Sequence, residues 1–430
     1  MFFNIILSKL QKNFNSIYNR SFLLQKIDWL IGLNILFVVL ASLFMSSDSI
    51  GNFALSAIIL TFIKLITKPN EKFEFNFADI FLLIYFMVIL ISVAGSSLFE
   101  LSCKGFLKTI IYLGFYISTI FYFKDNKDKI KYLFITLAFC VSFESIIALL
   151  QNYVSVAEIS GWQDTSRLNP EEIMTRVYGT LKPYNPNLFG GYLLATLPSF
   201  IALPFISKEN TGWTIIGGLL GIVALVLTGC RGAYIGLFFQ IIILLSIIYK
   251  FIKPQLQKTF LAIVGFFVMI MSLIIISISS LKARVFSIFA MRKDSSNSFR
   301  FNVYNSCVEM FKDNWLLGIG CGNQNFREIY GLYMKTGFDA LSAYNIYLEI
   351  AVESGIFALI AFVTFIITTL KSSLKFIFNK NNLEEKSFVI AAIISLFGIL
   401  IHGFVDTVFF RPQIQFTFWA MLGVIRVLVK

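Results

Sequence analysis

Residues 299–345 read FRFNVYNSCVEMFKDNWLLGIGCGNQNFREIYGLYMKTGFDALSAYN and differ sharply from the rest of the chain. Most of them belong to a polar loop, residues 281–342, that interrupts long apolar segments. A loop of this length in a compact protein is usually either functional or disordered. Trp315 and seven Phe or Tyr residues between Phe299 and Tyr333 argue against disorder, because disordered segments are poor in aromatic residues. We therefore expect a folded cap over a membrane-embedded site.

The composition of the whole chain predicts a membrane protein. Of its 430 residues, 57% are hydrophobic and only 14% are charged, whereas a soluble domain carries about 25% charged residues. Many stretches approach or exceed the roughly 20 apolar residues that cross a bilayer as a helix. The predicted fold is an all-α polytopic membrane helix bundle of about 12 transmembrane helices.

The apolar segments divide the chain into four parts. Residues 1–26 combine an apolar side with Lys and Arg, which is typical of a helix at the membrane interface. Residues 27–280 are expected to form spans 1–9, residues 281–342 the large loop, and residues 343–430 spans 10–12. The predicted spans are about 28–46, 50–67, 77–96, 104–123, 131–152, 184–206, 212–228, 232–250, 259–280, 343–370, 388–406 and 413–429.

The basic residues indicate the orientation. The formal net charge is +12, but Lys and Arg lie in short loops and, apart from the long loop, mainly on the side that carries both termini. This pattern places that side in the cytoplasm and the long loop outside an inner (plasma) membrane. The charge therefore implies no nucleic-acid partner. A second segment expected to face outward is residues 153–183.

The cysteine and histidine content predicts no metal or cofactor. The chain has five cysteines without CxxC spacing and a single histidine. Cys307 and Cys321 share the long loop, so two interpretations stay open: a disulfide in an oxidising compartment, or two small buried residues.

The first candidate site is LTGCRGAYIGL, residues 227–237. Arg231 lies here at an outward turn between two apolar spans. Positive residues are usually concentrated on the cytoplasmic side of a membrane, so an arginine at this position indicates a specific role. Flanking glycines let backbone approach a ligand, and a guanidinium binds a phosphate through two parallel hydrogen bonds. The alternative is an arginine that reaches lipid headgroups.

The second candidate joins the loop to SAYNIYLEIAVESG, residues 342–355. Asn345, Glu349 and Glu353 fall on one face of the helix that enters the membrane. Carboxylates there need a cavity or a cationic partner, and Arg231 and Arg300 are the partners we expect. The alternative is an ion pair that fixes the cap to the bundle. The run GIGCG at 318–322 is only a weak nucleotide signal.

The third candidate is IHGFVDTVFFRP, residues 401–412. His402 and Asp406 are one helical turn apart near the outer end of a span, and Arg411 follows. Such a group can relay protons or hold an anion, although a lone histidine on an apolar helix is more often a packing residue. Glu144, within the fifth span, is interpreted as a hydrogen-bonded structural carboxylate.

These motifs resemble the O-antigen ligase and polymerase superfamily of bacterial envelope glycan enzymes. The resemblance covers roughly residues 180–410 and rests on LTGCRGA, the W..G.G of the outer loop and AYN.YLE...ESG. It implies a glycan donor on undecaprenyl pyrophosphate, with Arg231 and Arg300 as pyrophosphate ligands. Ligases have a histidine where this chain has Tyr344, and a tyrosine is a poor base at neutral pH.

The resemblance makes Tyr344, Glu349 and Glu353 the candidate catalytic residues, with either glutamate in place of the missing histidine. The candidate substrate-binding residues are Arg231, Arg300, Asn345, Trp315, His402, Asp406 and Arg411. The sequences of residues 342–355 and 401–412 also resemble one branch of this superfamily, a group identified as inorganic-carbon (bicarbonate) transporters. Three functions therefore stay open: transfer of a lipid-linked glycan, transport of a small anion, and a non-catalytic role in glycan assembly. Membrane lipid is an expected partner in each, and no oligomeric state is predicted.

Overall fold

The computed structural model describes residues 2–154, 174–291, 294–380 and 382–429, and in these ranges it contains helices and turns but no strand. Within these ranges, eleven helical segments are long and apolar enough to cross a membrane by length and composition. The twelfth predicted span is α18 (Pro412–Leu428), with 17 residues. The prediction of an all-α polytopic membrane bundle is therefore confirmed.

The spans follow the predicted order. They are α3 (Ile27–Phe44), α4 (Ser47–Thr67), α5 (Phe77–Ala94), α6 (Phe99–Asp125), α7 (Ile130–Val154), α8–η5–α9 (Pro186–Ile206), α10 (Thr211–Leu227), α11 (Arg231–Phe251), α12 (Pro254–Ser277), α16 (Ile346–Asn379), α17 (Leu383–His402) and α18. The span predicted at 184–206 is broken into three short helices. Pro198 and Pro204 lie at the start of the second and third, where a missing backbone N–H costs least.

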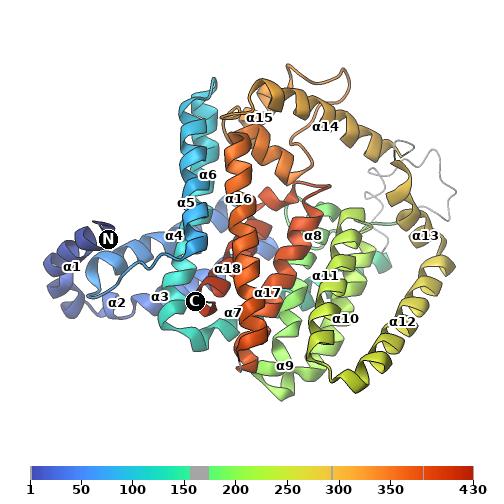
Figure 1. Ribbon diagram of the computed structural model, residues 1–430, viewed down its shortest axis with the longest axis horizontal. Helices are drawn as coiled ribbons and strands as arrows, with labels where there is room; N and C mark the ends of the chain where they lie inside the picture. Colours follow the sequence, from blue (N-terminus) through green and yellow to red (C-terminus); the bar gives the residue numbers. More distant parts are fainter. Residues whose placement is uncertain (1, 155–173, 292–293, 381, 430) are drawn as a thin grey trace.

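The long loop is folded, as predicted from its aromatic residues. It contains α13 (Ser279–Phe286), α14 (Ser295–Asp313) and α15 (Asn323–Tyr330); α14 and α15 lie above the bundle at the top of Figure 1, and α13 lies at its right-hand side. α14 packs against α16 and α15 against α6. We call this end of the bundle, where α16 and α18 begin, the loop end. Much of the other segment expected to face outward, residues 155–173, lies outside the described residues.

The glycine run 318–322 docks the loop onto α16. The backbone N–H of Ile319 donates to the Val352 carbonyl at 3.0 Å, and that of Gly320 donates to the Glu353 carbonyl at 2.9 Å. α16 is kinked at Gly355, whose φ is 78°, and Gly318 has a φ of 72°. A Cβ atom on Gly318 would overlap the backbone of Glu353. The run is thus a backbone-to-backbone contact and not a nucleotide loop.

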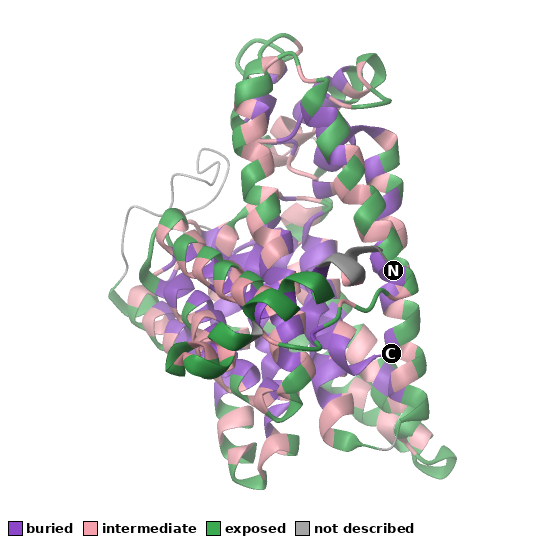
Figure 2. Ribbon diagram, turned by 90° about the vertical axis from the view of Figure 1, so that its left-hand side faces the viewer, coloured by how far each residue is buried: buried purple, intermediate pink, exposed green. Residues whose placement is uncertain are grey.

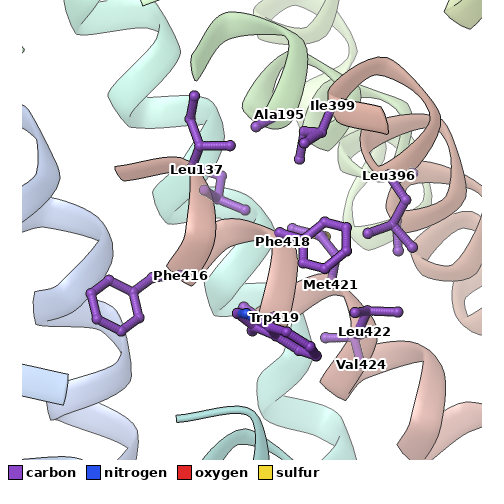
Figure 3. Close-up of a cluster of buried hydrophobic side chains, with 14 of the residues drawn as sticks. Leu137, Ala195, Leu396, Ile399, Phe416, Phe418, Trp419, Met421, Leu422 and Val424 are labelled. Carbon is purple, nitrogen blue, oxygen red and sulfur yellow. The ribbon is translucent and has the colours of Figure 1, made fainter. Parts of the chain in front are cut away.

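The interior is centred on α18. Figure 3 shows Phe418 of this helix near residues of α8 and α17, while Phe416 points to the other side, where its ring meets that of Phe115 on α6 at 5.0 Å. The rings of Phe418 and Trp419 meet edge to face with centroids 5.3 Å apart, a favourable aromatic geometry. The buried residues accordingly concentrate in the middle of the bundle in Figure 2.

The end opposite the loop is held by a buried ion network. Lys64 of α4 is fully buried and lies 2.6 Å from an Asp28 oxygen and 3.0 Å from an Asp125 oxygen. The N-terminal helix α1 (Phe2–Arg20) packs on α4 nearby, and the Gln11 amide donates to two backbone carbonyls there. Asp28 therefore has a structural role at this end of the bundle.

α12 is exceptional because none of its residues is buried. It packs chiefly against α13 and lies at the right-hand edge of Figure 1, away from the core of the bundle. A helix with an apolar centre and so little surface covered by protein is suited to contact with lipid.

Candidate functional site

Four arginine side chains converge at the loop end, from four separate parts of the chain. We call Arg176, Arg231, Arg284 and Arg300 the arginine cluster. Arg176 precedes α8, and its Nε donates to the Thr228 carbonyl at 2.8 Å. Arg284 lies on α13, and its Nε donates to the Gly229 carbonyl at 2.6 Å. The turn before Arg231 is therefore held by an arginine on each side.

Arg231 and Arg300 are each paired with an aspartate. Arg231, at the start of α11, lies 2.9 Å from a carboxylate oxygen of Asp294, the N-cap of α14. Arg300, on α14, lies 3.6 Å from Asp406, and its buried Nε has no hydrogen-bond partner among the described residues. The loop thus approaches Arg231 through its own aspartate, as expected of a cap.

Asp406 links Arg300 to Arg176. Its Oδ2 accepts a hydrogen bond from the Asn187 amide at 3.0 Å, and the Asn187 carbonyl oxygen accepts one from Arg176 Nη2 at 2.6 Å. Asn187 lies in the first turn of α8. This chain of contacts connects the first turn of α8, the second turn of α14 and the segment that follows α17.

The cluster carries an excess of positive charge. Among the residues that the structure describes, the four guanidinium groups are paired with two carboxylates, those of Asp294 and Asp406. Burial, together with Arg176 and Arg231, lowers the pKa of Arg284 to about 9, and burial also lowers the pKa of Arg176. Because these shifts express repulsion and lost hydration, a bound polyanion would stabilise the cluster.

The predicted ion pairs of Glu349 and Glu353 are wrong. Glu349 accepts a hydrogen bond from the Ala343 N–H at 3.1 Å, and Glu353 accepts one from the Gly322 N–H at 3.1 Å. Both carboxylates face turns of the loop, while the two arginines reach the aspartates instead. Buried carboxylates stabilised by backbone donors need no cation at contact distance.

Tyr344 has a strained backbone conformation beside Arg300. Its φ is +51°, which is unusual for a residue with a side chain, and such strain often marks functional sites. The Arg300 guanidinium lies 5.8 Å from the ring centroid. Burial and the nearby Asp406 raise the pKa of Tyr344, with Arg300 opposing them, so the phenol stays protonated at neutral pH. Tyr344 is thus a hydrogen-bond donor and not a base.

A cavity of about 820 Å³ opens beside the cluster. Arg176, Asp406 and Tyr344 line it on one side, and Glu349 and Glu353 line it deeper along α16. The opposite wall comes from α4 and α6, and α18 adds further residues. The cavity therefore contacts the arginine cluster through Arg176 and brings both buried glutamates to the same space.

Three of the predicted site residues have structural contacts that account for them. Asn345 is the N-cap of α16, and its side-chain oxygen accepts from the N–H groups of Tyr347 and Leu348 at 3.0 Å. Trp315 has an indole that is 52% exposed, and its carbonyl accepts from the Ile356 N–H at the kink of α16. His402 is buried, with its Nε2 3.5 Å from the Cys230 sulfur.

The other residues singled out from the sequence are also located. Arg411 is the N-cap residue of α18, with an exposed side chain that lines the cavity away from the arginine cluster. Glu144 accepts hydrogen bonds from the hydroxyl and the N–H of Thr180, which fits the structural interpretation. Cys307 and Cys321 are free and lie in separate apolar clusters, so the disulfide alternative is not realised.

Sequence reasoning missed three members of the site: Arg176, Asn187 and Arg284. The available signal was the one used for Arg231, a positive charge next to a span on the side predicted to face outward. Arg176 and Arg284 both satisfy it, but neither lies in a recognisable motif. Asn187 carries no signal of its own, since asparagine in a first helical turn is common.

Comparison with known proteins agrees with this architecture. Residues 216–363, about a third of the chain, match the family model described as O-antigen ligase. The chain is 30% identical over 216 residues to an uncharacterized protein of Haemophilus influenzae (strain Rd), which covers 47% of this chain and 54% of that protein. It thus matches about half the length of this relative. The family match spans Arg231, Arg300 and Tyr344 but ends before Asp406. The chain is a multi-pass membrane protein whose residues 216–363 are similar to the O-antigen ligase family.

Proposed function

We propose that the protein transfers a glycan from an undecaprenyl pyrophosphate carrier to an acceptor hydroxyl at the loop end, on the outer face of the inner membrane. The observation that carries this proposal is the arginine cluster, with four guanidinium groups and two carboxylates at the edge of a large cavity. A pyrophosphate supplies the negative charge that the cluster lacks. The family match over residues 216–363 supports a glycan as the transferred group.

The arginine cluster stabilises the leaving group in this reaction. The acceptor oxygen forms a bond to the anomeric carbon of the donor glycan, and the bond between that carbon and the phosphate oxygen breaks. Negative charge then accumulates on the pyrophosphate, where preorganised guanidinium groups stabilise it most. Asp294 and Asp406 hold Arg231 and Arg300 in position until the pyrophosphate replaces them as partners.

A buried glutamate accepts the proton of the acceptor hydroxyl. Glu349 and Glu353 both line the cavity, and each already accepts one backbone N–H, which leaves a second oxygen free to face the acceptor. Glu349 lies closer along α16 to Tyr344 and to the loop end. We assign Glu349 as the general base, with Tyr344 as a donor that orients the acceptor.

Exchange of Glu349 for glutamine is expected to lower the transfer rate by about 100-fold or more, as for loss of a general base. The amide can still accept the hydrogen bond from the Ala343 N–H, so the fold is retained. Glu353→Gln serves as the matched variant and should have the smaller effect. The measurement is single-turnover transfer at saturating donor. Equal rates for the wild type and Glu349→Gln would rule out this assignment.

The alternative function is transport of a small anion such as bicarbonate, because an arginine cluster also binds that ion. A carrier needs a polar path through the whole bundle. The lining of the cavity reaches Trp419 on α18, Tyr112 on α6 and Phe362 on α16, all close to the midpoints of these helices, and it does not continue to the opposite end. This depth favours a substrate chamber that opens at one face. A non-catalytic role in glycan assembly predicts carrier binding without turnover.

The experiment that separates these functions is a deletion strain complemented with wild type, Arg231→Ala or Arg300→Ala. Envelope glycans and bicarbonate uptake are measured in parallel. Glycan transfer predicts that both variants change the glycan profile and leave uptake intact. Reconstituted protein that moves labelled bicarbonate, combined with an unchanged glycan profile after deletion, would refute the proposal.

A further inference from the structure

The cavity has a second charged region, at its mouth and away from the arginine cluster. Lys104 and Lys108 lie one turn apart on α6, and Arg411 lies at the start of α18. All three side chains are exposed at the loop end and line the cavity. Asp48, at the start of α4, is the acidic residue of the same rim. We call Lys104, Lys108 and Arg411 the basic rim.

The basic rim has few acidic partners. Lys104 pairs with Glu100 at 2.9 Å, but both side chains are more than half exposed, and such pairs contribute little. In the described ranges, Lys108 and Arg411 form no ion pair. Cations at the end predicted to face outward also run against the usual charge bias of membrane proteins. Their charge is therefore available to a ligand that enters the cavity.

Below the rim, the wall changes from charged to aromatic. Tyr112, Phe416 and Trp419 line the cavity here, and the rings of Tyr112 and Phe416 pack edge to face at 5.0 Å. Glu349 and Glu353 supply acceptors at the same depth. Ligand pockets combine an apolar wall with a few such polar groups. Sugar rings, which have apolar faces and hydroxyl edges, match a wall of this kind.

We propose that this cavity is the acceptor site and that it selects an acidic glycan, whose carboxylate or phosphate groups contact the basic rim. The acceptor sugar then lies against the aromatic wall, with its hydroxyl directed toward Glu349. This inference rests on the proposed glycan transfer. The donor carrier occupies the arginine cluster, and the two substrates meet at Arg176, Asp406 and Tyr344, the residues shared by both regions.

The choice of acceptor is set outside the family domain. Lys104, Lys108 and Arg411 all lie outside residues 216–363, whereas three of the four members of the arginine cluster, Arg231, Arg284 and Arg300, lie inside them. Proteins that share the donor site are therefore free to differ at the rim, and a change of rim charge should change the acceptor and not the carrier.

The test uses the full-length protein in nanodiscs and a matched pair of probes, tetragalacturonate and its neutral methyl ester. Wild type should bind tetragalacturonate saturably and the ester about 10-fold more weakly, the equivalent of one charge-assisted contact. Raising the salt concentration should remove most of this preference. The double variant Lys108→Ala/Arg411→Ala should lose it at low salt. Lys371→Ala, an exposed lysine on α16 near the opposite end, is the control and should behave as wild type.

Undecaprenyl pyrophosphate binding is measured on the same samples to separate the two proposals. The rim variant should bind this carrier as tightly as wild type, and a matched melting temperature shows that it is folded. Equal binding of the two tetrasaccharides, or no saturable binding of tetragalacturonate, would overturn the acidic-acceptor site. If the wild-type protein does not bind undecaprenyl pyrophosphate at all, the proposed function is contradicted instead.

Discussion

Replacing Arg176 with alanine should reduce glycan transfer by about 100-fold to 1000-fold, the usual loss when a preorganised donor is removed from a site of developing charge. Arg176 is 3% exposed, holds the turn before Arg231 through the Thr228 carbonyl, and lines the cavity. Its loss removes one positive charge and loosens the position of a second. The measurement is release of undecaprenyl pyrophosphate from a lipid-linked glycan donor.

Two further variants make this result specific. Arg176→Lys keeps the charge but cannot contact Thr228 and Asn187 at once, so an intermediate rate is expected. Arg327→Ala removes an arginine of the same outer loop whose ion pair with Asp339 is more than half exposed, and it should leave the rate unchanged. A wild-type rate for folded Arg176→Ala would show that the cluster does not act on the leaving group.

Substitution of Gly318 by alanine should strongly destabilise the protein. The left-handed backbone alone costs a residue with a side chain about 1–3 kcal/mol, and here the added Cβ also overlaps the Glu353 carbonyl group. The segment cannot move away without breaking the hydrogen bonds of Ile319 and Gly320 to α16. We expect a lower yield of folded protein and a lower melting temperature in detergent. Gly355→Ala should act alike, because its Cβ meets the Leu316 carbonyl.

Gly337 offers the matched control for this prediction. Its φ is +85°, but a Cβ atom there would meet no atom within 4 Å. Gly337→Ala therefore carries the backbone strain without the overlap, and its melting temperature should fall between those of wild type and Gly318→Ala. Equal stability of the Gly318 and Gly337 variants would mean that docking of the loop onto α16 does not contribute to the fold.

The fold was predictable because its signals are local. Apolar runs near the length of a bilayer span identify helices without knowledge of their neighbours, and the aromatic residues of 299–333 indicate a folded loop. The role of the glycine run, which is only a weak nucleotide signal, could not be predicted because it is not local. Its glycines are explained by the backbone of α16, whose residues 352 and 353 lie more than thirty positions away.

The site was predictable only in part because its contacts are between distant segments. Arg231 stood out by its charge at a span boundary, yet its partners come from residues 287 and 294. Arg176 reaches Thr228 across 52 positions, and Asn187 reaches Asp406 across 219. Glu349 and Glu353 were correctly expected to need stabilisation, but backbone N–H groups provide it, and no pattern of charges reveals such donors.

The lack of buried residues in α12 gives the bilayer a direct influence on the arginine cluster. With 24 residues, α12 is about 36 Å long, whereas the hydrocarbon core is about 30 Å thick. A helix that is longer than the core tilts to fit, and α12 has little protein packing to fix its tilt. Its end continues into α13, which carries Arg284 against Gly229. Acyl-chain length in the surrounding membrane should therefore tune the geometry of the anion site, so that the protein works best in a membrane of one thickness.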